Sequence, residues 1–245
     1  IIPVDFTGNP VDLGKINEIA ARNDLVVIED AAHALGGEYK GQKLGSLSDM
    51  TMFSFHPVKH ITTGEGGMIL TDNEEYVDKL KTFRHHGIIK EGSQLEENHG
   101  PWYYEIQGLG HNFRITDIQC ALGISQMDKL AKFLRRRREI AIWYDEAFQD
   151  LEEVITPTET ENTKHAYHIY VIQLAKGLEK NRKEIFKALR AENIGVNVHY
   201  VPVHYHPFYQ EQFGYSEGDY PIAERYYSRA ITLPIFPKMK EKDVD

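Results

Sequence analysis

The sequence predicts an α/β protein with a mostly parallel sheet, followed by a smaller α+β unit. Strand-like and helix-like segments alternate over residues 12–83, as in parallel sheets with crossover helices. The apolar run Leu25–Ile28 has the length of a strand that is buried on both faces. After a long helical stretch the pattern of elements changes. We therefore predict a large domain over residues 1–150 and a small domain over 151–245.

Length and composition favour an ordinary globular protein. The chain has 245 residues, of which 41% are hydrophobic and 27% charged, enough to bury a sizeable core. Its 28 basic and 37 acidic residues give a net charge of −9, which argues against nucleic acid as a partner. Cys120 is the only cysteine, so an internal disulfide and a cysteine metal cluster are excluded. No apolar run is long enough to span a bilayer, and we expect a cytoplasmic protein without a membrane partner.

The first segment is expected to place a carboxylate at the edge of the sheet. Apolar residues at helical spacing predict a helix over 12–22. The strand over 25–28 then ends in Glu29 and Asp30. Open α/β sheets bind ligands beyond the carboxyl ends of their strands, so Asp30 lies where a site is expected.

Two more strands are predicted at residues 51–55 and 68–71, on either side of a glycine-bearing loop. Thr71 and Glu74 have the spacing of a capping box, which predicts a helix that ends at Gly87. Regular patterns fade over 91–110, where a long loop is usually functional or disordered.

The second half begins with a long helix. Thr116 and Gln119 have the spacing of a capping box, and helical periodicity extends toward Leu151. The elements after it are predicted as a strand over 168–174, a helix over 182–192, a strand over 196–201 and a helix over 223–230.

Four features together predict a site for pyridoxal phosphate. They are Asp30 at a strand end, the hydroxyl of Ser54, Lys59 five residues later, and the glycines of 64–67. Each alone has an ordinary explanation, because such residues also cap helices, face solvent or make turns. Together they match the cofactor: a lysine forms the Schiff base, a carboxylate pairs with the ring nitrogen and a hydroxyl bonds the phosphate.

The order of these residues resembles the DegT/StrS family of nucleotide-sugar aminotransferases. The likeness extends over essentially the whole chain and includes Leu109–Gln119, His199–His204 and Arg229–Pro234. Two finer stretches, 55–64 and 101–107, resemble the branch of the family that acts in pseudaminic acid biosynthesis.

The resemblance implies the fold type I architecture of pyridoxal phosphate enzymes and a homodimer with active sites at the subunit interface. It implies transamination at C4 of a UDP-4-keto-6-deoxy-N-acetylhexosamine, with glutamate as amino donor and 2-oxoglutarate as its product. Another nucleotide-4-keto-sugar aminotransferase and a non-catalytic regulator that binds cofactor or sugar nucleotide remain as alternatives. Lys59 favours an enzyme, because a regulator does not need a Schiff-base lysine.

The resemblance also implies roles for individual residues. Lys59 would bond to the cofactor, Asp30 would bind the ring nitrogen, His33 would lie beside the ring, and Ser54 would hold the phosphate. Asn112 would reach the phosphate of the other subunit's cofactor, and Arg114 would meet an anionic group of the substrate.

Three histidines, His199, His204 and His206, also suggest a metal site. No ligand cysteine or helical His-Glu pair accompanies them, so we expect no metal and favour a pocket lined by polar rings, with His204 binding substrate. Compared with the family, the sequence lacks an upstream part with the first strands and the phosphate-binding helix, and a final helix. We expect that residues 1–245 alone do not turn over substrate.

Overall fold

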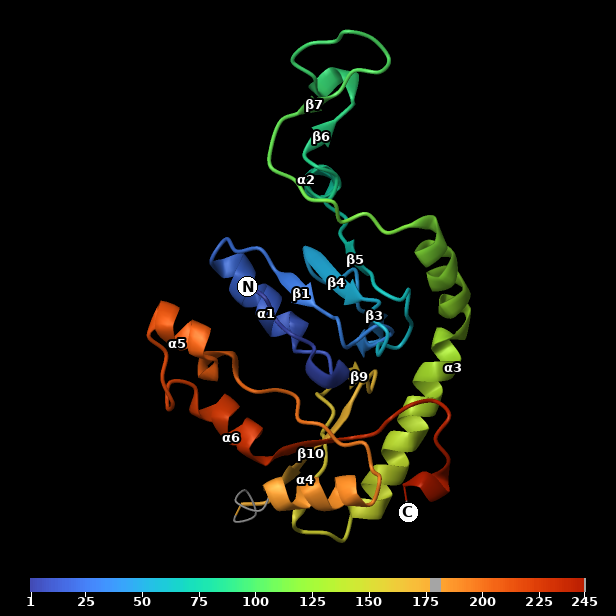
Figure 1. Ribbon diagram of the computed structural model, residues 1–245, viewed down its shortest axis with the longest axis vertical. Helices are drawn as coiled ribbons and strands as arrows, with labels where there is room; N and C mark the ends of the chain where they lie inside the picture. Colours follow the sequence, from blue (N-terminus) through green and yellow to red (C-terminus); the bar gives the residue numbers. More distant parts are fainter. Residues whose placement is uncertain (177–181, 245) are drawn as a thin grey trace.

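The computed structural model in Figure 1 describes residues 1–176 and 182–244. Its helices are α1 (Leu13–Arg22), α2 (Glu74–Phe83), α3 (Asp117–Phe148), α4 (Arg182–Ala191), α5 (Pro207–Phe213) and α6 (Pro221–Arg229). Its strands are β1 (Ile28–Asp30), β2 (Glu38–Tyr39), β3 (Gln42–Lys43), β4 (Met50–Ser54), β5 (Gly67–Leu70), β6 (Ile88–Ile89), β7 (Glu105–Ile106), β8 (Val154–Ile155), β9 (Thr163–Lys164), β10 (Tyr170–Leu174) and β11 (Ala230–Leu233).

The first sheet has the strand order β1-β4-β5. β1 and β4 are parallel, with Ile28 opposite Met50, whereas β4 and β5 are antiparallel. The chain before α1 also runs alongside β1, where Val4 forms a parallel bridge with Asp30. The predicted α/β class is confirmed, and the sheet within this chain is mixed.

The run Leu25–Ile28 is not buried on both faces, contrary to the sequence prediction. The strand begins only at Ile28, and Leu25, Val26 and Ile28 are 37–48% exposed, whereas Val27 is buried. The reason is that α1 packs on one face of the sheet, where its Leu13 joins Phe53 in a buried cluster. Side chains that alternate to the other face are not covered by the described part of the chain.

Of the two predicted capping boxes, one is present in the structure and the other is displaced. The capping box of Thr116 and Gln119 is present at the start of α3, which confirms that prediction. The box predicted at Thr71 is wrong by two residues, because Asn73 is the N-cap of α2 and its side chain accepts bonds from Glu75 N and Tyr76 N. The Thr71 hydroxyl instead donates to Asp49 O.

Residues 88–110 form an arm instead of a structureless loop. β6 and β7 pair antiparallel, with Ile88 opposite Ile106. In Figure 1 this hairpin lies at the top and extends away from the first sheet, next to α2. Trp102 and Ile106 on the arm are 75% and 65% exposed.

The last part of the chain is built on the antiparallel sheet β11-β10-β8. The strand predicted over 196–201 does not form. Asn197 makes a single antiparallel bridge with Thr232, and because β11 begins at Ala230 it could pair with only two further residues of this segment. The chain continues instead into a short 3-10 helix at Val203–Tyr205.

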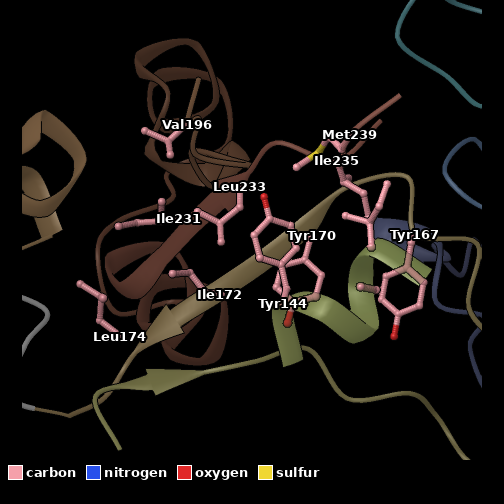
Figure 2. Packing of buried hydrophobic residues seen from close by; sticks show 12 residues of the cluster. Tyr144, Tyr167, Tyr170, Ile172, Leu174, Val196, Ile231, Leu233, Ile235 and Met239 are labelled. Atoms are coloured by element: carbon pink, nitrogen blue, oxygen red, sulfur yellow. The ribbon is translucent and has the colours of Figure 1, made fainter. Parts of the chain in front are cut away.

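Two buried clusters hold the molecule together. One lies between α1 and the first sheet. The other, shown in Figure 2, gathers β10, β11 and the second half of α3, with the rings of Tyr144 and Tyr170 stacked 4.8 Å apart. Ile140 and Tyr144 place the end of α3, which precedes the predicted division near residue 150, in the second core. The exact boundary stays a prediction.

Arg137 connects α3 to the segments before β10 and after β11. Its side chain is 5% exposed, and its Nη1 donates to Tyr167 O, His168 O and Ile235 O at 2.9–3.0 Å. Buried carbonyl oxygens that lose a donor are costly, so this residue fixes the approach of α3 to the ends of β10 and β11.

We predict that Arg137→Met lowers the free energy of unfolding by about 3 kcal/mol, because three buried carbonyls lose their donor. Arg135→Met on an exposed position of the same helix is the control and should change it by less than about 0.5 kcal/mol. Urea denaturation measures both. Equal losses in the two variants would show that the carbonyl contacts of Arg137 are unimportant.

Candidate functional site

The parallel pairing of β1 and β4 brings two of the predicted site residues to one edge. Asp30 ends β1, Ser54 ends β4, and Ala31 N donates to Met52 O at 3.0 Å where the two strands finish. Asp30 Oδ1 accepts a bond from Ala32 N at 3.1 Å, which fixes the carboxylate at the start of the following turn. The carboxyl ends of these strands are where α/β sheets place ligands.

Lys59 lies on the loop that follows β4. Its backbone N–H donates to His56 O at 3.0 Å, so the lysine occupies a tight turn directly after Ser54. Its side chain is partly exposed. Burial lowers the pKa of Lys59 below the ordinary lysine value, while the nearby Asp30 carboxylate acts to raise it. The two groups are therefore close enough to influence each other's charge.

The glycine-rich end of this loop makes a turn. Phe55 N donates to Gly66 O at 2.8 Å and closes the loop, and Gly64 has φ +82°, in the left-handed region. At Gly66 a Cβ atom would lie 2.4 Å from Thr63 Oγ1. The glycines are therefore required by the loop itself, and close approach of a ligand is not needed to explain them.

His33 lies on the turn after β1, among aromatic rings. Its ring centroid is 4.5 Å from that of His168 and 6.0 Å from that of Phe6. Burial, followed by the charge of Lys59, lowers the pKa of His33 to about 4. Its Nδ1 is buried and has no hydrogen-bond partner among the described residues. At neutral pH this histidine is uncharged and has one ring nitrogen available.

Three further histidines surround Lys59. Burial lowers the pKa of His60 to about 3, and its Nε2 is 2.9 Å from Ala166 O. Burial also lowers the pKa of His168 and of His199, with Lys59 contributing in both cases. His199 Nδ1 is 2.8 Å from Thr232 Oγ1. Because all these rings are neutral at pH 7, they add polar atoms to the site but no charge.

A cavity of about 780 Å³ is lined by Ser54, Lys59, His168 and His199, whereas Asp30, His33 and His60 do not line it. Its lining comes from the loop after β4, from α3 and β10, and from the segments around the bridge of Asn197 and Thr232. The lining residues are Ser54, His56, Val58, Lys59, Glu65, Arg137, His168, Ile169, Gly195, Asn197, His199, Tyr200, Thr232, Leu233, Pro234 and Ile235. The cavity therefore lies between the two cores, with Lys59 and Ser54 on its wall.

Asn112 and Arg114 lie elsewhere. Both are exposed, on the extended segment between the arm and α3, and Arg114 Nε donates to Asn112 Oδ1 at 2.9 Å. Neither lines the cavity. The structure thus holds the two side chains together but apart from Lys59, and their predicted reach into another subunit stays a prediction.

His204 does not lie on the cavity wall either. The residue is 5% exposed, and its Nε2 is 2.8 Å from Glu224 Oε1 on α6. Its ring packs 4.8 Å from that of Tyr220. These contacts give His204 a structural part in holding the short 3-10 helix to α6, and they do not support the prediction that it binds substrate.

Sequence reasoning missed several residues on the cavity wall. Arg137, His168 and Thr232 come from α3, from just before β10 and from β11, so they are far apart in sequence and no local motif joins them. One indication was available: His165 and His168 directly precede a buried strand, and polar rings at such a position need partners.

In residues 1–176 and 182–244, no group of three or more His, Cys, Asp or Glu side chains is arranged to hold a metal ion. Across the same residues, every helix is too short or too polar to cross a membrane.

Comparison with known proteins identifies the family. The chain matches the DegT/DnrJ/EryC1/StrS aminotransferase family over residues 1–245. It belongs to this family. The predicted resemblance is thereby confirmed, together with the fold type I class and pyridoxal phosphate as the cofactor of the family.

Three similar proteins illustrate the relationship. The spore coat polysaccharide biosynthesis protein SpsC of Bacillus subtilis is 43% identical over 247 residues, which cover 100% of this chain and 64% of SpsC. The UDP-4-amino-4,6-dideoxy-N-acetyl-beta-L-altrosamine transaminase of Campylobacter jejuni is 38% identical over 240 residues, covering 98% of this chain and 61% of the transaminase. The solved structure of Helicobacter pylori PseC, an aminotransferase of pseudaminic acid biosynthesis, superimposes with a TM-score of 0.91 at 32% identity, covering 100% of this chain and 63% of that one.

The chain spans 61–64% of the length of these curated relatives. What it contains still fits pyridoxal phosphate. An amine with a lowered pKa lies on the cavity wall, the Asp30 carboxylate is close enough to act on its charge, and Nδ1 of His33, whose pKa Lys59 helps to lower, has no partner among the described residues. Lys59, Asp30, His33 and Ser54 are the residues that would hold the cofactor.

We predict that Lys59 is more reactive than the exposed lysines of the cofactor-free protein. A hydrogen bond with Glu75 raises the pKa of Lys79, whereas burial lowers that of Lys59. In competitive acylation followed by peptide mapping, Lys59 should therefore reach half-maximal reactivity at a lower pH than Lys79. Asp30→Asn should lower the pKa of Lys59 further, because the carboxylate that raises this pKa is then absent. A Lys59 that titrates with or above Lys79 would contradict the geometry.

Proposed function

We propose that the protein is a nucleotide-sugar aminotransferase that aminates C4 of a UDP-4-keto-6-deoxy-N-acetylhexosamine for pseudaminic acid biosynthesis, with glutamate as the amino donor. The observation that carries the proposal is Lys59, which is partly buried on the cavity wall and within reach of the charge of Asp30. Similarity to altrosamine transaminases of Campylobacter jejuni and Helicobacter pylori, at 38% and 33% identity, supports the choice of substrate.

Each residue has a proposed part in the chemistry. The lowered pKa of Lys59 gives its Nζ a larger neutral fraction near neutral pH, so that it can act as nucleophile and then accept or return a proton. Asp30 would hold a proton on the ring nitrogen of the cofactor, and Ser54 would bond its phosphate. Pyridoxal phosphate, when bound, supplies the electron sink that transamination needs. The neutral ring of His33 would lie beside it.

A second sugar specificity has support of its own. SpsC is 43% identical to this chain, which is higher than the identity to the altrosamine transaminases, and its name places it in spore coat polysaccharide biosynthesis. Another nucleotide-4-keto sugar is therefore the main competing substrate. A purely regulatory role finds no support, because Lys59 and its lowered pKa would have no use in it.

We predict that the purified protein, prepared with any residues its gene encodes on either side of 1–245, transfers an amino group to one of a panel of UDP-4-keto sugars. Mass spectrometry of the products identifies the sugar, and omission of glutamate tests the donor. Lys59→Ala should abolish the product, whereas Lys43→Ala, on an exposed position, should not. Failure of the wild type on the whole panel, with cofactor bound, would reject the proposed function.

We also propose that the active site is shared between two subunits. Asn112 and Arg114 are exposed, bonded to each other and absent from the cavity of their own chain, as expected of side chains that serve a partner. In a two-fold dimer each subunit would give these residues to the other's site, because an isologous interface repeats the same contact.

Complementation of two defective chains tests this arrangement. A Lys59→Ala chain and an Asn112→Ala chain can form a mixed dimer in which one site carries both lesions and the other carries neither. We predict recovery to roughly a quarter of wild-type activity, because half of randomly mixed dimers are heterodimers with one intact site.

Two controls are needed for this experiment. Asn112→Ala alone must be severely impaired, and tagged chains must be shown to exchange. If both conditions hold and activity does not return, Asn112 acts within its own subunit and the shared site is wrong.

A further inference from the structure

Two carboxylic acids, Asp5 and Glu29, lie completely buried beneath the proposed cofactor site. Each is 0% exposed. Val4 forms a parallel bridge with Asp30, and Asp5 N donates to Asp30 O at 3.0 Å, so the chain at Asp5 runs directly alongside β1. Because side chains alternate along a strand, Asp5 and Glu29 share one face of the sheet and Asp30 points to the other.

The hydrogen bonds of this pair leave one oxygen on each acid without a donor. Glu29 Oε2 accepts from Thr51 Oγ1 at 2.7 Å and from Ser48 Oγ at 3.2 Å, and Asp5 Oδ1 accepts from Val11 N at 2.9 Å. Asp5 Oδ2 and Glu29 Oε1 are buried and find no donor in the described part of the chain. Buried polar atoms are rarely left without a hydrogen bond, so these two oxygens require a hydrogen-bond donor.

A proton between the two acids supplies that donor. Asp5 and Glu29 lie on adjacent segments of the chain and on the same buried face of the sheet, and two neighbouring carboxylates away from water cannot both be ionised at low cost. Burial, followed by the charge of Glu29, raises the pKa of Asp5 to about 8. One proton on the pair therefore satisfies both oxygens and leaves a single negative charge.

Among residues 1–176 and 182–244, no cation is found among the groups that act on Asp5. Besides Glu29, the charged group that acts on Asp5 is Asp30, which also disfavours ionisation. Asp49 and Asp12, on segments next to this face, are bonded elsewhere, to Val27 N and to Lys15 and Tyr39. Lys59, on the far side of Asp30, interacts with the Asp30 carboxylate.

We propose that Asp5 and Glu29 share one proton at neutral pH, and that the negative charge left on the pair supports, from behind Asp30, the proton that Asp30 holds on the ring nitrogen of the cofactor. The second half of this inference rests on the proposed function. Asp5 and Glu29 are then positioning residues: they touch neither substrate nor cofactor, and they act through the charge of Asp30.

Two variants separate charge from packing. Asp5→Asn replaces a shared O–H by an N–H donor, so under the proposal the pair keeps its single negative charge. Asp5→Asn combined with Glu29→Gln keeps the size and the hydrogen bonds of the pair but removes that charge. The two proteins therefore differ by one buried charge at nearly constant shape.

The shared proton is tested on the cofactor-free protein by its unfolding equilibrium as a function of pH. The pKa of Asp5 is raised from 3.8 in the unfolded chain to about 8 in the folded one, so folding takes up a proton between these values. Its stabilising effect is complete below pH 3.8 and is lost as the pH rises toward 8. Relative to Asp5→Asn, the wild-type folding constant should fall by about tenfold per pH unit across this window. A ratio that does not change with pH would overturn the shared proton.

A second measurement covers the case in which Asp5→Asn fails to fold. Infrared spectroscopy of the wild type at pH 7 should show the carbonyl stretch of a buried protonated carboxylic acid, and this band should disappear above about pH 8. If only carboxylate bands are present at pH 7, the shared proton is wrong.

The link to the cofactor is tested by nitrogen NMR of the bound, ring-labelled cofactor. In Asp5→Asn, the ring nitrogen of the bound cofactor should titrate as it does in the wild type. In the double variant it should lose its proton about one pH unit lower, as expected when one charge is removed from the protein nearby. If the ring nitrogen titrates identically in all three proteins, the charge of the Asp5 and Glu29 pair does not help Asp30 to hold the proton on the cofactor. If the wild type binds no cofactor, the proposed function fails while the unfolding experiment still decides the shared proton.

Discussion

The parallel contact between β1 and β4 is the constraint on which the rest of the site depends. It brings the ends of two strands together, so that Asp30 and Ser54 lie at one edge of the sheet and the turn with Lys59 follows immediately. The chain before α1 continues the same parallel order on the other side of β1 and places Asp5 beneath Asp30. Without this register the Asp30 carboxylate would not lie close enough to act on the charge of Lys59.

Burial then decides which of the groups around this edge carry charge. Removal from water keeps His33 neutral, lowers the pKa of Lys59, and holds a proton on the pair formed by Asp5 and Glu29. The same physical effect thus yields a reactive amine, an uncharged ring and a buried anion within one small region. Arg137 closes this region by joining α3 to the carbonyl groups near β10 and β11.

Local features of the site were predictable from the sequence, and its long-range contacts were not. Asp30 and Lys59 were predictable because strand ends and short motifs depend on residues that are close together in the sequence. For the same reason, the capping box of Thr116 predicted the start of α3. His168 was missed because it meets His33 only through the fold. The strand expected over 196–201 is reduced to the single bridge of Asn197 with Thr232, a contact between distant parts of the chain that no local pattern predicts.

Borohydride reduction of the cofactor-bound protein, followed by peptide mapping, tests the central claim most directly. The account predicts that the reduced cofactor is found on Lys59, the amine with a lowered pKa on the wall of the cavity. Recovery of the label on another lysine, such as Lys43 or Lys90, would contradict it.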